Sequence, residues 1–136
     1  MHPWERYIQR VQNHDIIAGK YIKLAVDRHV RDLTCQSTED FPYYFDEKIA
    51  EGICKFFPAA LRHSIGEHAG QRFTVEDWQA VCLASLCGWQ RDDGRGRRFR
   101  QAFFTVARKN GKSTLAAGIA MYMASIDFNP VSNEPE

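Results

Sequence analysis

One stretch decides the expected fold: FFTVARKNGKST, residues 103–114. Its first half is apolar and rich in aromatic and β-branched residues, which predicts a buried β-strand around residues 102–107. Its second half is polar and contains Gly111, a residue type that lets the backbone turn. A helical pattern then runs to about Ser125, with apolar positions at Leu115, Ile119, Tyr122 and Ile126. The stretch therefore predicts a strand, a loop and a helix in succession.

The loop has the composition of the second half of a phosphate-binding P-loop. Lys112 can reach the β- and γ-phosphates of a nucleotide, and the Ser113 hydroxyl can ligate Mg²⁺. Backbone N–H groups at the start of the following helix favour an anion. The full motif has a glycine five residues before Gly111, where this chain has Val106. A polar turn before a capped helix is the open alternative, and phosphate binding requires that 108–113 form a turn.

Charge is distributed unevenly along the 136 residues, although the net charge is only +1. Between Arg91 and Lys112 there are eight Lys or Arg and two Asp, so this zone carries +6. The remaining residues carry −5. A basic zone beside the loop suits a polyanion such as a nucleotide or nucleic acid, and a solvated basic loop is the alternative.

Three helices are expected in the first 60 residues. The first begins at Pro3 and ends near Asn13; its apolar face is Trp4, Tyr7, Ile8 and Val11. The second follows Gly19, with an apolar stripe of Ile22, Val26, Val30 and Leu33. The third starts near Asp46 and is expected to stop at Pro58; its stripe is Ile49, Ile53, Phe56 and Phe57.

A fourth helix is expected after an ambiguous segment at 59–71. Thr74 is its predicted N-cap, and it runs from Val75 to about Leu86. Its predicted apolar side is Val75, Trp78, Cys82 and Leu86. Gly88 ends it, and Asp92 to Gly96 form a turn. The residues from 128 to 136 show no pattern and are expected to be disordered.

Other site classes receive little support from the composition. The four cysteines form no CxxC pair, so we expect reduced thiols in a cytoplasmic protein. His63 and His68 lack a matching pair of cysteines, which argues against a zinc site. No apolar run approaches the length of a membrane span.

A family resemblance rests on these residues in combination: Trp78-Gln79, Gly88-Trp89, Arg97 to Arg100, and Ala107 to Ala117. Together they resemble the large subunit of tailed-phage terminases, which are DNA-packaging ATPase–nuclease motors. The resemblance extends over nearly the whole chain, to about Asp127. It implies an α/β fold: a truncated P-loop NTPase domain preceded by a mostly helical region. The implied divisions are residues 1–74, residues 75–127 and the tail.

The resemblance also implies roles for individual residues. Arg108 and Lys112 are the implied catalytic residues, with Arg108 acting in cis on the γ-phosphate. Gln79 stands where the family has its adenine-recognising glutamine, and Trp78 packs beside it. Ser113 is the implied Mg²⁺ ligand. The implied ATP-binding residues are Gln79, Arg108, Lys109, Asn110, Gly111, Lys112, Ser113 and Thr114.

The expected function is the N-terminal part of a terminase that binds ATP with Mg²⁺ to power DNA packaging in the bacterial cytoplasm. The implied partners are double-stranded DNA, the small terminase subunit and the portal, and an incomplete sheet favours self-association. No second acidic strand follows the P-loop helix in the sequence, so we expect a truncated product of a prophage or an expressed fragment, without hydrolysis of its own. The alternatives are a non-catalytic helical binding module with a vestigial P-loop, and a piece of an unrelated P-loop kinase or helicase.

Overall fold

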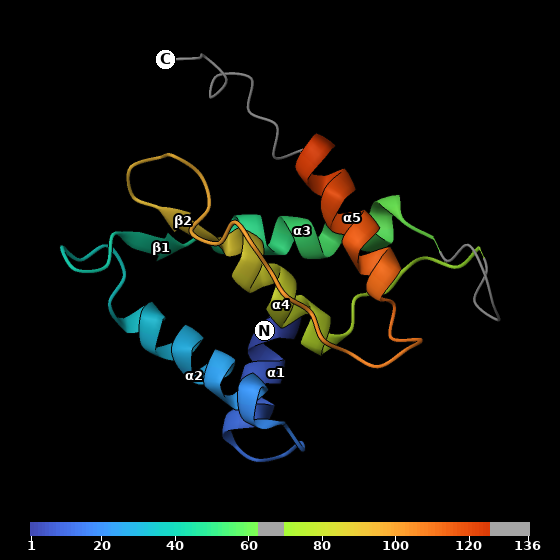
Figure 1. Cartoon of the computed structure of the whole chain (residues 1–136), viewed down its shortest axis with the longest axis horizontal. Helices are drawn as coiled ribbons and strands as arrows, with labels where there is room; N and C mark the ends of the chain where they lie inside the picture. Colours follow the sequence, from blue (N-terminus) through green and yellow to red (C-terminus); the bar gives the residue numbers. More distant parts are fainter. Residues whose placement is uncertain (63–69, 126–136) are drawn as a thin grey trace.

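The computed structural model describes residues 1–62 and 70–125 (Figure 1). The described part contains five α-helices and two short strands. In chain order these are α1 (Pro3–Gln12), α2 (Lys20–Thr34), β1 (Tyr43–Phe45), α3 (Glu47–Ala60), α4 (Asp77–Gly88), β2 (Trp89–Arg91) and α5 (Lys112–Ser125). Three sequence predictions concern residues outside these ranges. They are the disorder of the tail, the apolar position at Ile126 and the absence of a zinc site at His63 and His68.

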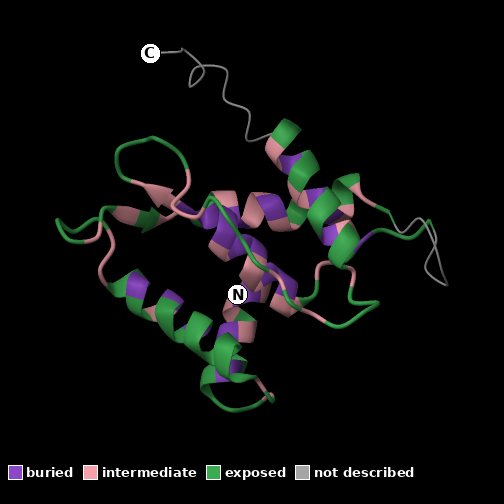
Figure 2. Cartoon of the chain, viewed as in Figure 1, coloured by how far each residue is buried: buried purple, intermediate pink, exposed green. Residues whose placement is uncertain are grey.

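Helix α4 occupies the centre of the molecule. Figure 2 shows buried residues concentrated on α4 and on α3 beside it. One hydrophobic cluster joins α4 to α3 and α5 through residues such as Leu83, Phe57 and Leu115. A second cluster joins α4 to α1, α2 and α3, and in it the small Ala80 and Ala84 lie among the larger side chains of α1. Both clusters contain residues from before and after residue 74. The boundary between a helical region and an ATPase domain at that residue stays a prediction.

The two-sided packing of α4 corrects its predicted orientation. A single apolar side at Val75, Trp78, Cys82 and Leu86 was expected, but Trp78 and Cys82 are only half-buried. The buried set is instead Gln79, Ala80, Leu83, Ala84, Leu86, Cys87 and Gly88. Neighbours on several sides of a helix bury more of its circumference than one stripe. The N-cap is Glu76 rather than Thr74, and the side chain of Gln79 closes the capping box.

The first and third helices start as predicted. His2 and Pro3 begin α1, which buries Trp4, Ile8 and Val11. The carboxylate of Asp46 accepts hydrogen bonds from the backbone N–H groups of Lys48 and Ile49, at 2.9 and 3.1 Å, and so caps α3. The expected stop at Pro58 is wrong by two residues, because α3 continues to Ala60. Proline at this position loses one helical hydrogen bond near the end of the helix and does not break it.

Helix α2 forms where the sequence predicted it, but a different face is buried. Val26 is buried, whereas Ile22 and Leu33 of the predicted stripe are exposed. His29 and Asp32 take interior positions instead. The Trp89 indole Nε1–H donates to His29 Nδ1 at 3.1 Å, and Arg98 Nη1 donates to Asp32 Oδ2 at 2.7 Å. Burial of these two polar side chains is tolerated because each is hydrogen-bonded, in both cases to a partner far away in sequence.

The small sheet was not predicted. β1 and β2 pair antiparallel, with Tyr43 opposite Arg91 and Phe45 opposite Trp89. Gly88 joins α4 directly to β2, and a Cβ at this position would lie 2.5 Å from the Phe45 ring. Only glycine therefore allows the aromatic ring to pack against the end of α4.

The strand predicted at residues 102–107 is not found. Within residues 1–62 and 70–125, no strand lies beside this segment, so it has no ladder of hydrogen bonds. It runs as an irregular chain from β2 past α4 to the start of α5 (Figure 1), and Phe103 is 94% exposed. The fold is thus α/β in the coarse sense of helices with a two-stranded sheet. The described residues show no parallel sheet of a P-loop NTPase.

Helix α5 extends to Ser125, as predicted, and packs on α3 through its buried Leu115, Gly118 and Tyr122. A Cβ at Gly118 would lie 2.3 Å from Phe57 Cε1 and 2.7 Å from Leu61 Cδ1. The close approach of α3 and α5 therefore depends on this glycine. It fixes the position of the helix that begins with Lys112.

Candidate phosphate-binding loop

Residues 108–111 form a turn between the irregular 101–107 segment and α5. Lys109 and Gly111 have positive φ angles of 65° and 71°, and this reverses the chain. The first helical bond of α5 runs from Leu115 N–H to the Gly111 carbonyl at 2.8 Å. The N–H groups of the preceding residues in α5 consequently lack helical partners and lie at the loop. The turn predicted over 108–113 is found at 108–111, because Lys112 and Ser113 already belong to α5. It places a helix N-terminus where an anion is favoured.

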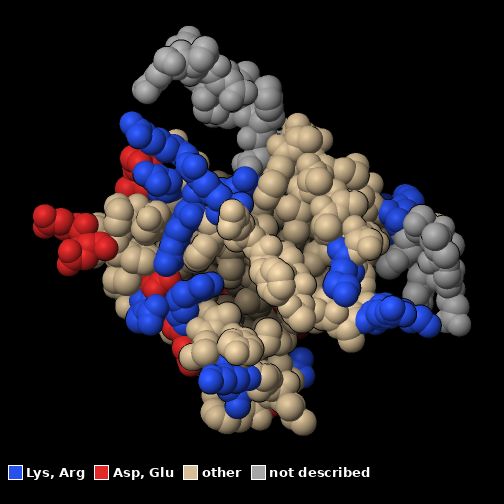
Figure 3. Space-filling view, viewed as in Figure 1, with Lys and Arg blue, Asp and Glu red and all other residues tan. Residues whose placement is uncertain are grey.

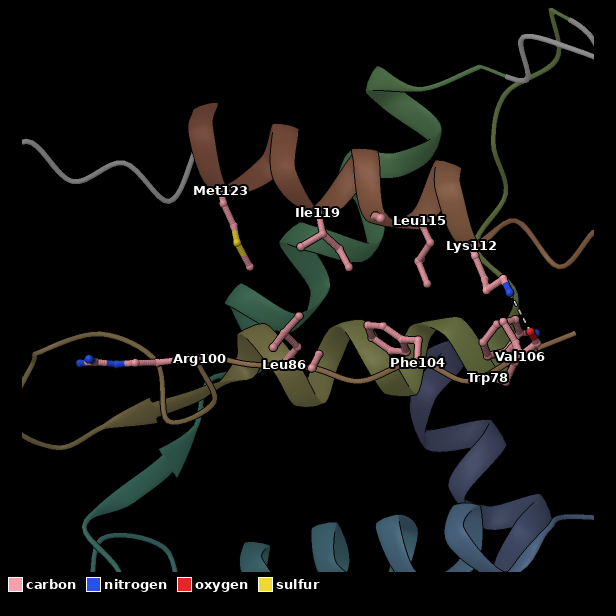
Figure 4. A pocket seen from close by; sticks show the side chains of 11 residues that line it. Trp78, Leu86, Arg100, Phe104, Val106, Lys112, Leu115, Ile119 and Met123 are labelled. Carbon is pink, nitrogen blue, oxygen red and sulfur yellow. Dashed lines mark hydrogen bonds between the residues drawn. The ribbon is translucent and has the colours of Figure 1, made fainter. Parts of the chain in front are cut away.

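The side chain of Lys112 folds back across this turn. Its Nζ donates to the Val106 carbonyl at 2.9 Å, a contact drawn as a dashed line in Figure 4. Asn110 Nδ2 donates to the Ala107 carbonyl at 3.1 Å. Both bonds are exposed, and both join residues of the same short segment. The loop is therefore held mainly by its own residues. A phosphate oxygen would be a stronger acceptor for the lysine than a neutral carbonyl.

Gln79 and Phe73 contact the loop from behind. Gln79 is buried at 4% exposure, its Oε1 accepts from Glu76 N–H at 2.9 Å, and its Nε2 lies 3.5 Å from the Asn110 carbonyl oxygen. The position of a Cβ on Gly111 would be 3.6 Å from Gln79 Nε2 and 3.7 Å from the Phe73 ring. The sequence singled out Gln79 but missed Phe73, whose only signal was an aromatic residue just before a helix. Adenine recognition by Gln79 stays a prediction.

A cavity of about 410 Å³ opens beside the loop, between α5 and the 100–106 segment (Figure 4). Lys112 lies at one end and Arg100 at the other. The wall between them is apolar and includes Trp78, Phe104 and Ile119. Its chemistry suits a group with a flat apolar part and an anionic end near Lys112.

The other predicted site residues lie on the outer surface of the loop. Arg108, Lys109 and Ser113 are exposed, and Thr114 is half-buried in the first turn of α5. For Arg108, the described residues supply no hydrogen bond or ion pair. The structure therefore brings Arg108 to Thr114 together in one turn, with Gln79 behind it.

The basic zone is divided by the fold. Figure 3 shows Lys and Arg side chains gathered over β2, the turn after it and α2. Arg98 is half-buried among them: it is paired with Asp32 and lies within 5.3 Å of the ring centroids of Phe41, Tyr43, Trp89 and Phe99. Arg91 pairs with Asp93 in the turn. Only the 108–112 part of the zone reaches the phosphate loop, so two basic surfaces replace the one expected.

Comparison with known proteins bears on this loop directly. Residues 77–134 match the family model of the terminase large subunit, ATPase domain. Over these residues the chain is similar to the terminase ATPase domain. The matched range includes α4, the phosphate loop and α5, and the resemblance derived from the residues is confirmed for it. Neither a curated protein nor a solved structure matches the chain.

A terminase ATPase domain uses a nucleotide and a divalent cation, and both need donor groups at the loop. Among the described residues, no group of three or more His, Cys, Asp or Glu side chains could hold a metal ion. Ser113 supplies one hydroxyl beside the loop. Mg²⁺ is commonly bound through one or two protein ligands together with phosphate oxygens and water. These residues therefore fit Mg²⁺ carried by a nucleotide and do not fit a free ion.

Proposed function

We propose that residues 107–114 bind the β- and γ-phosphates of Mg-ATP, in a terminase-type ATPase that powers DNA packaging in the bacterial cytoplasm. The observation that carries the proposal is the turn at 108–111, which sets the Lys112 ammonium beside the N-terminus of a 14-residue helix. The family match over 77–134 supports the same reading. Double-stranded DNA, a small terminase subunit and a portal are the proposed partners. No helix among the described residues has the length and apolar character needed to cross a bilayer.

Each side chain has one task in this proposal. Lys112 exchanges its bond to the Val106 carbonyl for the β- and γ-phosphates, and the loop backbone from Lys109 to Thr114 surrounds them. Ser113 would ligate the cation. When bound, Mg²⁺ would supply positive charge that offsets the negative charge developing during phosphoryl transfer.

Arg108 is proposed to contact the γ-phosphate. It is exposed and has no hydrogen-bond partner among the described residues, so it can turn toward an anion at the loop. An arginine placed there stabilises the charge of the transferring phosphoryl group. Arg108→Ala is expected to weaken ATP more than ADP in isothermal titration, because ADP lacks the γ-phosphate. Equal weakening of both nucleotides would remove this role.

The central test is thermal unfolding with and without Mg-ATP. A ligand at 100 times its Kd stabilises the folded state by about 2.7 kcal/mol, which raises the melting temperature by several degrees. Lys112→Ala is expected to abolish the rise. The matched control is Lys48→Ala, an exposed lysine on α3 that should leave the rise intact. An unchanged melting temperature of the wild-type chain in excess Mg-ATP would contradict nucleotide binding and favour the non-catalytic binding module.

A further inference from the structure

The amide of Gln79 is already engaged on both sides within the protein. Its Oε1 accepts the Glu76 N–H at 2.9 Å, which closes the capping box of α4. Its Nε2 is directed at the Asn110 carbonyl oxygen, 3.5 Å away and 31 positions later in the chain. With the residue 4% exposed, little of the amide remains for a base. One N–H and one oxygen lone pair of the amide stay uncommitted. Reading adenine requires that the base reach them, and the burial of Gln79 prevents this.

From this geometry we propose that Gln79 is a positioning residue for the phosphate loop and does not select the base. The proposal rests on the proposed function, because it assigns a role within the same site. Its physical basis is the planar trans peptide between Asn110 and Gly111. In such a peptide the C=O and the N–H point to opposite sides. An amide that holds the Asn110 oxygen therefore turns the Gly111 N–H away from α4, toward the side where a phosphate would lie.

The surroundings of Gly111 support the same role. Gln79 Nε2 and the Phe73 ring lie 3.6 and 3.7 Å from the position that a Gly111 Cβ would take. These two side chains form a wall behind the turn. At Gly111 the φ angle is 71°, a backbone state that glycine adopts without steric cost. The wall and the hydrogen bond together select one orientation of the peptide among those open to a flexible glycine.

The test compares ligands that share phosphates and differ in the base. The probes are Mg-ATP, Mg-GTP and magnesium tripolyphosphate, each titrated by calorimetry. Gln79→Met removes the donor without adding charge, and Gln79→Glu removes it while keeping an acceptor for the Glu76 N–H. Gln79→Met is expected to weaken all three ligands by the same factor, about five- to tenfold, the usual effect of one hydrogen bond. Gln79→Glu is expected to weaken all three more strongly, because its carboxylate also repels the phosphates. The ratio of ATP to GTP affinity should not change.

Asp77→Asn is the matched control. Asp77 lies in the same turn of α4 but pairs with Arg6, with Arg6 Nε donating to Asp77 Oδ2 at 2.7 Å. Loss of that ion pair perturbs the start of α4 without touching the loop. All three affinities should match those of the wild-type chain. A loss as large as that of the Gln79 variants would mean that helix stability, rather than the contact to Asn110, controls the loop.

A second measurement needs no ligand. In the free protein, the Gly111 amide resonance should shift and its hydrogen exchange should become faster in both Gln79 variants, and in Asp77→Asn it should not. An unchanged Gly111 amide would overturn the positioning role. So would a changed ATP-to-GTP ratio with unchanged tripolyphosphate binding, which would assign base reading to Gln79 and leave the phosphate loop intact. If the wild-type chain bound none of the three probes, both this inference and nucleotide binding would fall.

Discussion

The packing of α5 against α3 gives the sharpest prediction about the free energy of unfolding. In Gly118→Ala, the new methyl group would lie 2.3 Å from Phe57 Cε1, 2.6 Å from Phe57 Cζ and 2.7 Å from Leu61 Cδ1. Ordinary carbon contacts are 3.4–4 Å. Phe57 is fully buried, so its ring cannot move into solvent. The two helices must separate or the ring must leave its preferred rotamer.

The magnitude follows from two opposing effects. Overpacking a core by one methyl group costs about 1–3 kcal/mol, and overlaps of more than 1 Å with a buried ring place this site near the top, at ~3 kcal/mol. Alanine is a better helix former than glycine by about 1 kcal/mol. The expected net loss is about 2 kcal/mol of unfolding free energy, measured by urea titration with circular dichroism.

The chain contains a matched control for this substitution. Gly52 is also inside a helix, α3, but a Cβ there would meet only the Tyr122 hydroxyl at an ordinary 3.6 Å. Gly52→Ala should therefore gain the helix propensity, about 0.5–1 kcal/mol, without a clash. A Gly118→Ala protein as stable as the wild-type chain would refute the packing described for α5. So would equal effects of the two substitutions.

Three further predictions concern other contacts. Burial lowers the His29 pKa to about 4, with Arg28 and Arg98 adding to the effect. Between pH 6.5 and pH 4 the unfolded chain therefore binds a proton that the folded chain does not, so the free energy of unfolding should be full above pH 6.5 and fall by about 3 kcal/mol toward pH 4. His29→Gln should flatten this slope in pH-dependent urea titrations. Arg98→Ala leaves the buried Asp32 carboxylate with only the longer contact to Arg31 at 3.3 Å, and should cost roughly 3 kcal/mol at most by the same titration, more than loss of an exposed ion pair. Lys109→Gly relieves a positive φ of 65° and should raise the melting temperature, whereas the β-branched Lys109→Val should lower it.

The helices could be predicted from the sequence because their signals are local. Pro3, the Asp46 cap and the apolar spacing of α5 each determine a helix end or face from a few neighbouring residues. The turn at 108–111 belongs to the same class, since Gly111 and the polar run around it need no distant partner. For these elements the sequence and the structure agree within two residues.

The remaining features depend on partners that are distant in sequence. Trp89 makes His29 an interior residue across 60 positions, and Arg98 does the same for Asp32 across 66. No periodicity in α2 reports such partners, so the stripe containing Ile22 and Leu33 was the natural but wrong choice. The strand at 102–107 failed for the related reason that strand propensity is expressed only beside another strand.

The candidate site was predictable in composition but not in arrangement. The sequence identified the turn residues and Gln79 together only through the family resemblance, because 31 positions separate Gln79 from Asn110. What it could not give was the direction of the Gln79 amide, which follows from the capping box at Glu76. The contact of Phe73 with Gly111 likewise depends on how α3, α4 and α5 meet.

Helix α4 contributes side chains to both hydrophobic clusters, and this has a consequence for how the protein loses its structure. If α4 melts, α1 loses its packing partner and the α3–α5 pair loses the α4 side of its cluster at the same moment, so neither half retains a complete core. Heat and denaturant should therefore give one sharp transition, seen alike by tryptophan emission and by helical dichroism. A protease cut between α3 and α4 should release no folded half, and the two pieces should refold only when mixed.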